Sequence, residues 1–210
     1  MQNADLTFDF CEVEVKELFN KNLPDSELLD FYNRLANREI FINWDIEDQL
    51  VEYSKQIIDW NKVDKGKPIE ERKPIKIFIN TDGGSISAMW NFINVVQLSK
   101  TPCITIAMGK IYSAGSMIFL AAPIRLLFKN TTIMIHKGSS GVISDISCII
   151  NYSKYLEKET DMRKEYIFSN TKITPKKYKE IEDKDWYITA SEAIEWGIAT
   201  KIVDDIDEII

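Results

Sequence analysis

A single histidine, His136, occurs among the 210 residues, so only one imidazole is available as a base near neutral pH. Cysteine is scarce too. Cys11, Cys103 and Cys148 are odd in number and far apart, without the paired spacing of a zinc site or a CxxC redox motif. We therefore expect a reduced, cytoplasmic protein with no catalytic cysteine and no metal site.

Long apolar runs, basic clusters and phosphate loops are also missing. The longest strongly apolar stretch, residues 117–124, is far too short to cross a bilayer, and the acidic start does not resemble a signal peptide. A net charge of -7 without a stripe of Lys and Arg argues against a nucleic-acid partner. The GxxxxGK[ST] motif of ATP-binding loops is absent from the sequence. We expect a soluble protein that binds neither nucleic acid nor membrane.

The acidic residues gather at the start of the chain. Residues 1–30 contain eight acidic side chains and two lysines, whereas the remainder is nearly neutral. After Pro24, apolar residues recur at helical spacing as far as Arg38, which predicts a short amphipathic helix. We expect residues 1–37 to form an acidic extension that contains this helix. Residues 38–210 should form a single domain, because a chain of this length builds one sizeable core.

Short apolar runs alternate with helical patterns through that domain. The runs predict strands at residues 39–43, 75–80, 103–108 and 132–135. A repeated strand, turn and helix order implies an α/β fold, in which functional groups collect at the carboxyl ends of strands.

Helices are predicted between and after these strands. Asp45 is a candidate cap for one helix, and a second passes through Met89. A third, over residues 144–170, is the longest and carries apolar residues on more than one side. Thr174 and Thr189 are typical caps for two short helices.

A serine beside a histidine is the chemistry that the sequence favours. His136 ends an apolar strand and precedes a loop rich in glycine and serine. Ser116 lies in a small-residue segment where an abrupt strand-to-helix turn could expose its hydroxyl, and Ser113 is a rival in the same segment. The glycine pair after the second strand could turn the Gly84 N–H toward a bound carbonyl oxygen.

The third member of such a site is a carboxylate that orients the imidazole. Asp185 lies just before an apolar strand near the end of the chain. Asp183 stands two residues earlier, and chemistry alone leaves both open.

Five motifs, taken in order, resemble the proteolytic subunit of the Clp protease, a serine peptidase with a crotonase-like fold. They cover most of the chain, from about Arg38 to Val203. These motifs are REIFINWDIED at residues 38–48, INTDGGSI at 79–86, GSM at 115–117, IMIH at 133–136 and DWYITASEAIEWG at 185–197.

The resemblance implies a repeated β-β-α spiral with a protruding long-helix handle. It assigns Ser116 as nucleophile, His136 as general base and Asp185 as orienting carboxylate. The oxyanion donors would be the N–H groups of Gly84 and Met117. Backbone near three further residues would pair with an extended substrate strand: Ile86, Ser139 and Ser140.

Some spacings depart from the family pattern. The segment from Gly109 to Ser116 is a few residues longer than is typical, and the gap from Ser116 to His136 is somewhat shorter. Asn43 and Trp44 replace the usual Thr-Gly, and Asp82 replaces a proline.

By resemblance, the partners are unfolded polypeptides or short peptides, further copies of the chain in two stacked heptamers, and a separate Clp ATPase that unfolds substrates. The helix over residues 144–170 would make the ring-to-ring contact. The scheme requires no cofactor. Two other functions compete: a crotonase-type acyl-CoA hydratase or isomerase, and an inactive or weakly active ring subunit.

Overall fold

The computed structural model describes residues 26–139 and 141–210 and divides the chain into two units. The first unit is Met1–Asn37, of which helix α2 (Ser26–Asn37) is described. This helix confirms the one predicted after Pro24. The second unit is Arg38–Ile210, so the division falls where the sequence places the end of the acidic extension.

The second unit alternates strands and helices along the chain. In order they are β1 (Glu39–Ile42), α3 (Leu50–Val63), η1 (Ile69–Glu71), β2 (Ile75–Thr81), α4 (Ile86–Leu98), β3 (Cys103–Tyr112), α5 (Ala114–Phe119), β4 (Ile124–Phe128), β5 (Thr132–Ile135), α6 (Ile146–Asn170), α7 (Pro175–Ile181), β6 (Trp186–Ile188), α8 (Ala190–Glu195), β7 (Lys201–Val203) and η2 (Ile206–Glu208).

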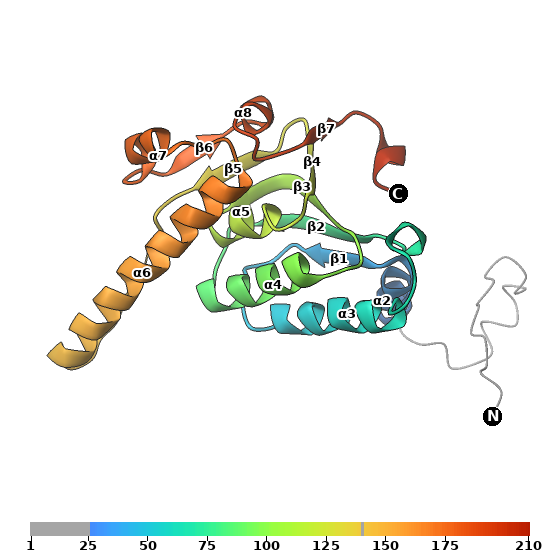
Figure 1. Ribbon diagram of the computed structural model, residues 1–210, viewed down its shortest axis with the longest axis horizontal. Helices are drawn as coiled ribbons and strands as arrows, with labels where there is room; N and C mark the ends of the chain where they lie inside the picture. The colour runs from blue at the N-terminus through green and yellow to red at the C-terminus, as the bar shows by residue number, and fades with distance from the viewer. Residues whose placement is uncertain (1–25, 140) are drawn as a thin grey trace, which may run out of the picture. The chain divides into compact units, whose positions relative to one another are not determined.

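A mostly parallel sheet forms the centre of this unit. β1, β2, β3, β4 and β7 lie side by side in this order and run parallel. β5 pairs with the end of β3, and β6 pairs antiparallel with β5. Figure 1 shows α3, α4 and α5 on one side of the strands, while the long helix α6 projects away from them. The predicted α/β architecture with a protruding helix is confirmed.

Local sequence accounts for most of these elements. β2 buries all of one face and Phe78 on the other, where Phe78 packs in an apolar cluster with Ile106 and Leu126, as expected of a central parallel strand. Ser85 caps α4 by accepting the N–H of Ala88. Thr174 caps α7, and Thr189 forms a capping box with Glu192 at the start of α8, which confirms both predicted caps.

Three parts of the sheet differ from the prediction. Asp45 does not cap a helix, because Ile46 pairs with Gly84 as an isolated bridge and α3 begins only at Leu50. β3 continues past Gly109, where its partner changes from β4 to β5. The short strands β4 and β7 were not predicted, since each is brief and next to charged residues that mask its pattern.

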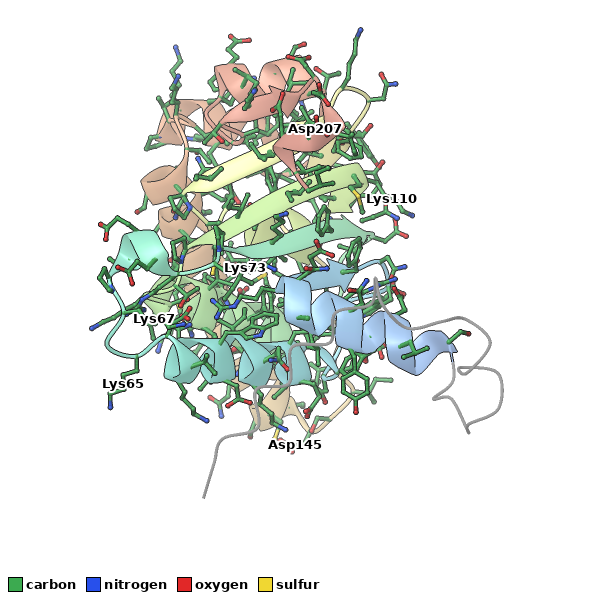
Figure 2. The ribbon with its side chains drawn as sticks, turned by 90° about the vertical axis from the view of Figure 1, so that its right-hand side faces the viewer. Lys65, Lys67, Lys73, Lys110, Asp145 and Asp207 are labelled. Carbon is green, nitrogen blue, oxygen red and sulfur yellow. The ribbon has the colours of Figure 1, made fainter. Side chains whose placement is uncertain are left out.

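A buried ion pair lies at the opposite end of the sheet from the strands' carboxyl ends. Both oxygens of the fully buried Asp64 accept from the guanidinium of Arg38, which also donates to the carbonyl of Lys73. Thr101 donates to the same carboxylate, and Lys67 Nζ lies 3.3 Å from Asp64 Oδ1. Figure 2 labels Lys67, which stands on the loop after α3. The Arg38 hydrogen bonds, which outweigh burial, hold the pKa of Asp64 well below its usual range.

Two cysteines are described, and both are free thiols. Cys103 begins β3, at the end remote from Ser113, and burial raises the pKa of its thiol to about 11. Cys148 is exposed on α6, and Cys11 lies outside the described residues. Across residues 26–139 and 141–210, no helix has both the length and the apolar character that crossing a membrane requires.

Candidate active site

Three segments that carry predicted site residues meet at one edge of the sheet. β3 and β5 are parallel neighbours, so Ser113 after β3 and His136 after β5 both follow carboxyl ends of adjacent strands. β6 runs antiparallel to β5, and Asp185 precedes it, so Asp185 lies opposite His136. Strand register alone therefore brings the three side chains together.

Ser113 occupies a strained turn between β3 and α5. Its backbone has φ 53° and ψ -120°, a region that non-glycine residues rarely adopt. The Ser113 N–H donates to the carbonyl of Met134 on β5 at 2.9 Å, and α5 begins at the next residue. A serine on a strained strand-to-helix turn holds its hydroxyl out beyond the sheet, as nucleophiles in α/β-hydrolases do.

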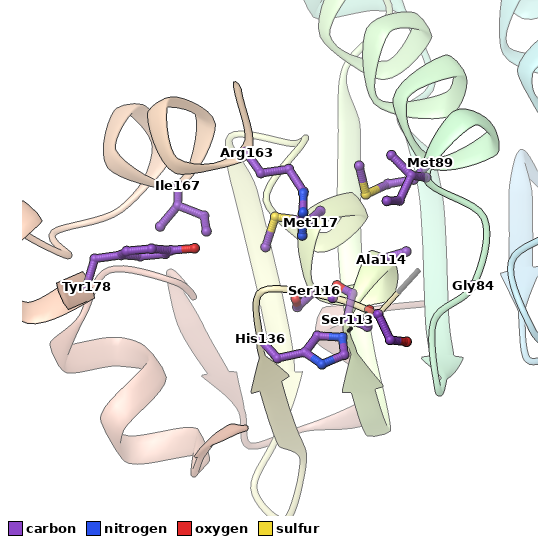
Figure 3. Close-up of a pocket in the computed structure, with 13 residues that line it drawn as sticks. Gly84, Met89, Ser113, Ala114, Ser116, Met117, His136, Arg163, Ile167 and Tyr178 are labelled. Atoms are coloured by element: carbon purple, nitrogen blue, oxygen red, sulfur yellow. Dashed lines mark hydrogen bonds between the residues drawn. The ribbon is translucent and has the colours of Figure 1, made fainter. Parts of the chain in front are cut away.

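The hydroxyl of Ser113 contacts the only imidazole of the chain. Ser113 Oγ lies 2.7 Å from His136 Nε2, and Asp185 Oδ1 lies 3.4 Å from the other ring nitrogen, Nδ1 (Figure 3 shows the first pair). A carboxylate beside Nδ1 favours the tautomer with its proton there, so Nε2 is left to accept the serine proton. Asp183 instead lies 3.5 Å from Lys137, so the structure brings Asp185 rather than Asp183 to the histidine.

The prediction that Ser116 lies against His136 is wrong. Ser116 is on α5, only 1% exposed, and its hydroxyl donates to the carbonyl of Ser113 at 2.6 Å. Its position one helical turn after Ser113 directs it back onto the turn and away from the imidazole. Ser113, the rival serine of the sequence analysis, takes the predicted place.

The predicted oxyanion donors are also revised in part. The Met117 N–H faces the Ser113 carbonyl at 3.4 Å within α5, so it is not available to a ligand. Ala114 is the first residue of α5, and its N–H has no intrahelical partner. Gly84 stays a candidate donor, because within the described part of the chain its N–H donates to no other group. Ala114 and Gly84 both line the cavity beside Ser113.

Neighbouring backbone holds the Gly84 turn in place. The Ile46 N–H donates to the carbonyl of Gly83 at 2.7 Å, and the Ser85 N–H donates to the carbonyl of Ile46 at 2.6 Å. Gly84 has φ +143°, and a Cβ at this position would lie 2.2 Å from the Ile46 oxygen. Only glycine therefore fits this crossing of two backbones.

A cavity of about 160 Å³ opens beside the serine and histidine (Figure 3). Ile86 and Ser139, two of the predicted substrate-binding residues, line it, and both also line a wider groove along α6. Ser140, the third, lies outside the described residues. Arg163 and Tyr178 reach the cavity from α6 and α7, and neither was predicted.

One signal in the sequence pointed to Ser113, the serine that contacts His136. Moving the nucleophile position from Ser116 to Ser113 shortens the segment after Gly109 and lengthens the gap to His136 by the same three residues. Both spacing departures noted above are reduced by that single change. No comparable signal marks Arg163 or Tyr178, since their distance from the site in sequence conceals their contact with the cavity.

Comparisons with known proteins identify the family to which the chain is similar. The family profile described as Clp protease matches residues 24–205. The ATP-dependent Clp protease proteolytic subunit 2 of Treponema denticola is 29% identical over 203 residues, which cover 96% of this chain and 98% of that protein. The protein of the same name in Treponema pallidum is 27% identical over 181 residues, or 85% of this chain and 88% of that protein.

A solved structure shares the fold. A ClpP1 mutant from Listeria monocytogenes superposes with a TM-score of 0.73 at 24% identity, covering 85% of this chain and 98% of its own. This similarity confirms the crotonase-like fold predicted from the sequence. Because the family profile spans most of the chain, we conclude that the chain belongs to the Clp protease family of serine peptidases.

Proposed function

We propose that the chain is a peptidase subunit that cleaves polypeptides with Ser113, His136 and Asp185. The observation that carries the proposal is the 2.7 Å contact between Ser113 Oγ and His136 Nε2 at the carboxyl ends of β3 and β5. Asp185 on the other ring nitrogen completes the set. A serine hydroxyl becomes a nucleophile when an adjacent base takes its proton.

The reaction proceeds through an acyl-enzyme. Ser113 Oγ attacks the peptide carbonyl carbon while His136 Nε2 takes the hydroxyl proton, and the N–H groups of Gly84 and Ala114 donate to the oxyanion. His136 then gives the proton to the leaving amine as the C–N bond breaks. Water, deprotonated by the same imidazole, releases the acid and restores Ser113. The scheme uses no metal and no organic cofactor.

Substrate binds in extended form. The cavity and the groove along α6 share Ile86, Gly138 and Ser139, so one continuous surface leads to Ser113. A polypeptide strand that adds its backbone to the segment at Gly138 would be gripped by its main chain. We propose that unfolded polypeptides and short peptides are the substrates.

Assembly of several copies accounts for the exposed apolar residues of the projecting α6. Ile146, Ile149 and Ile150 are 76%, 40% and 50% exposed, and Ile143 just before the helix is fully exposed. We propose that this surface joins copies of the chain in stacked heptameric rings, as expected from the resemblance. Relatives are named ATP-dependent, and this sequence has no ATP-binding loop, so a separate Clp ATPase would unfold substrates in the cytoplasm.

Two measurements separate this function from its competitors. Purified protein should hydrolyse short fluorogenic peptides, and Ser113→Ala should abolish hydrolysis while assembly is preserved. An acyl-CoA hydratase or isomerase needs no serine nucleophile, so enoyl-CoA turnover that survives Ser113→Ala would favour that class. Intact rings without peptidase activity would favour the inactive subunit.

A further inference from the structure

The part of the cavity that lies away from His136 is lined by both apolar and polar side chains. Met89, Met117 and Ile167 supply apolar wall, and Arg163 and Tyr178 approach from the side opposite Gly84 (Figure 3). In ligand pockets, a small number of precisely placed polar groups fixes the orientation of the ligand and provides specificity.

Arg163 has donors left over after its contacts with the protein. Its Nε donates to Glu159 at 2.8 Å, and its Nη2 donates to Thr160 at 3.3 Å. Nη1 lies near the backbone of Gly138 and, among the described residues, makes no hydrogen bond. A guanidinium carries five N–H donors, so the Nη1 pair is available to a group in the cavity.

Tyr178 presents an unused hydroxyl to the same space. The residue is only 5% exposed, and within the described part of the chain its hydroxyl makes no hydrogen bond. Every fully buried polar side-chain atom described has a partner, so this hydroxyl must be reachable from the cavity. Figure 3 shows it pointing toward Met117. Burial raises the pKa of Tyr178, so the neutral hydroxyl can both donate and accept.

We propose that this cavity binds the side chain on the acyl side of the scissile bond and selects glutamine, through Arg163 Nη1 and the Tyr178 hydroxyl. The carboxamide oxygen accepts from Arg163, and the carboxamide N–H donates to Tyr178. The aliphatic stem packs on Met117 and Ile167. The inference rests on the proposed peptidase function.

Local charge explains why an amide is preferred over a carboxylate. Glu159 is 1% exposed and already neutralises Arg163, while its other oxygen accepts from the Trp90 indole at 3.3 Å. A glutamate in the substrate would leave this buried cluster with a net negative charge. Lysine or arginine would face the Arg163 guanidinium, and an apolar side chain would leave both polar groups without a partner.

The test compares kcat/KM for peptides that differ only at this position, with glutamine, glutamate, norleucine or lysine. The wild-type protein should cleave the glutamine peptide fastest, by roughly tenfold or more over norleucine, the range for a hydrogen bond to a charged group. Tyr178→Phe should lower the ratio of glutamine to norleucine severalfold, whereas Tyr155→Phe, on the exposed surface of α6, should not change it.

Removing Arg163 alone would leave the buried carboxylate of Glu159 without its cationic partner. The second variant is therefore the double change Glu159→Gln with Arg163→Met. Compared with Glu159→Gln alone, it should abolish the preference for glutamine and favour norleucine. The inference is overturned if the wild-type protein cleaves the norleucine or the glutamate peptide fastest. It is also overturned if the ratio of kcat/KM for glutamine to that for norleucine is unchanged in both variants. Either result leaves the proposed peptidase function standing. If no peptide is cleaved in a Ser113-dependent manner, the glutamine preference and the proposed peptidase function both fail.

Discussion

A methyl group added at Gly84 tests the oxyanion site directly. The new Cβ would lie 2.2 Å from the Ile46 oxygen and 2.8 Å from its nitrogen, in a backbone conformation with φ +143°. Contacts under 3 Å with the backbone of Ile46 cannot be relieved by moving a side chain, so the turn must shift and carry the Gly84 N–H with it. Loss of one oxyanion donor costs about 2.7–4 kcal/mol, or roughly 10²- to 10³-fold in kcat.

The assay is peptide hydrolysis under saturating substrate, with thermal unfolding measured on the same sample. Gly66→Ala is the matched control, because Gly66 also has a positive φ of +92° but its Cβ would meet nothing within 4 Å. It should lower stability by about 1 kcal/mol and leave kcat unchanged. A folded Gly84→Ala protein with kcat within twofold of the wild type would refute the assignment of this N–H to the oxyanion.

Three further changes test other parts of the account. Asp185→Asn should lower kcat by about 10- to 10³-fold. This loss is smaller than the roughly 10⁴-fold typical of a buried carboxylate, because the Asp185 side chain is 57% exposed and lies 3.4 Å from the His136 ring. The control Asp183→Asn should have little effect on kcat. Asp64→Asn should destabilise the fold by about 3–5 kcal/mol by breaking a buried ion pair, whereas Asp59→Asn, in an exposed pair, should not. Because the folded pKa of Asp64 is depressed, its contribution is fully present above the unfolded pKa of about 3.9 and is lost progressively as pH falls from there toward the folded pKa. Thermal melts from pH 7 down to about pH 2 should therefore show the stability difference between the wild type and Asp64→Asn shrinking below about pH 4. The wild type should sediment as an oligomer much larger than a dimer, and Ile149→Glu should reduce its size; a wild-type monomer at micromolar concentration would contradict the assembly.

Much of the fold was predictable because its core strands are apolar runs bounded by turns. β1 buries every second residue, and most residues of β2 and β5 are buried, so the apolar pattern of the sequence located these strands. β4 and β7 were missed because each is brief and contains or adjoins charged residues that mask its apolar pattern. Ile46 joins the sheet through one bridge to Gly84, a contact that no local pattern signals.

The candidate site was predictable in chemistry and only partly in detail. The single histidine identified His136, and the family resemblance selected Asp185 over Asp183; the strand register places His136 and Asp185 together. The choice between Ser113 and Ser116 depended on the backbone conformation of one residue. The positive φ of Ser113 arises from the packing of β3, β5 and α5, and residue type alone does not encode it.

Mapping the adduct of a fluorophosphonate probe tests the central claim most directly. The probe reacts with an activated serine, and mass spectrometry of the digested protein identifies the modified residue. We predict an adduct on Ser113, no labelling of Ser113→Ala, and undiminished modification of Ser113 in Ser116→Ala, whose hydroxyl only donates to the Ser113 carbonyl. An adduct on Ser116, or labelling that persists in Ser113→Ala, would contradict the account.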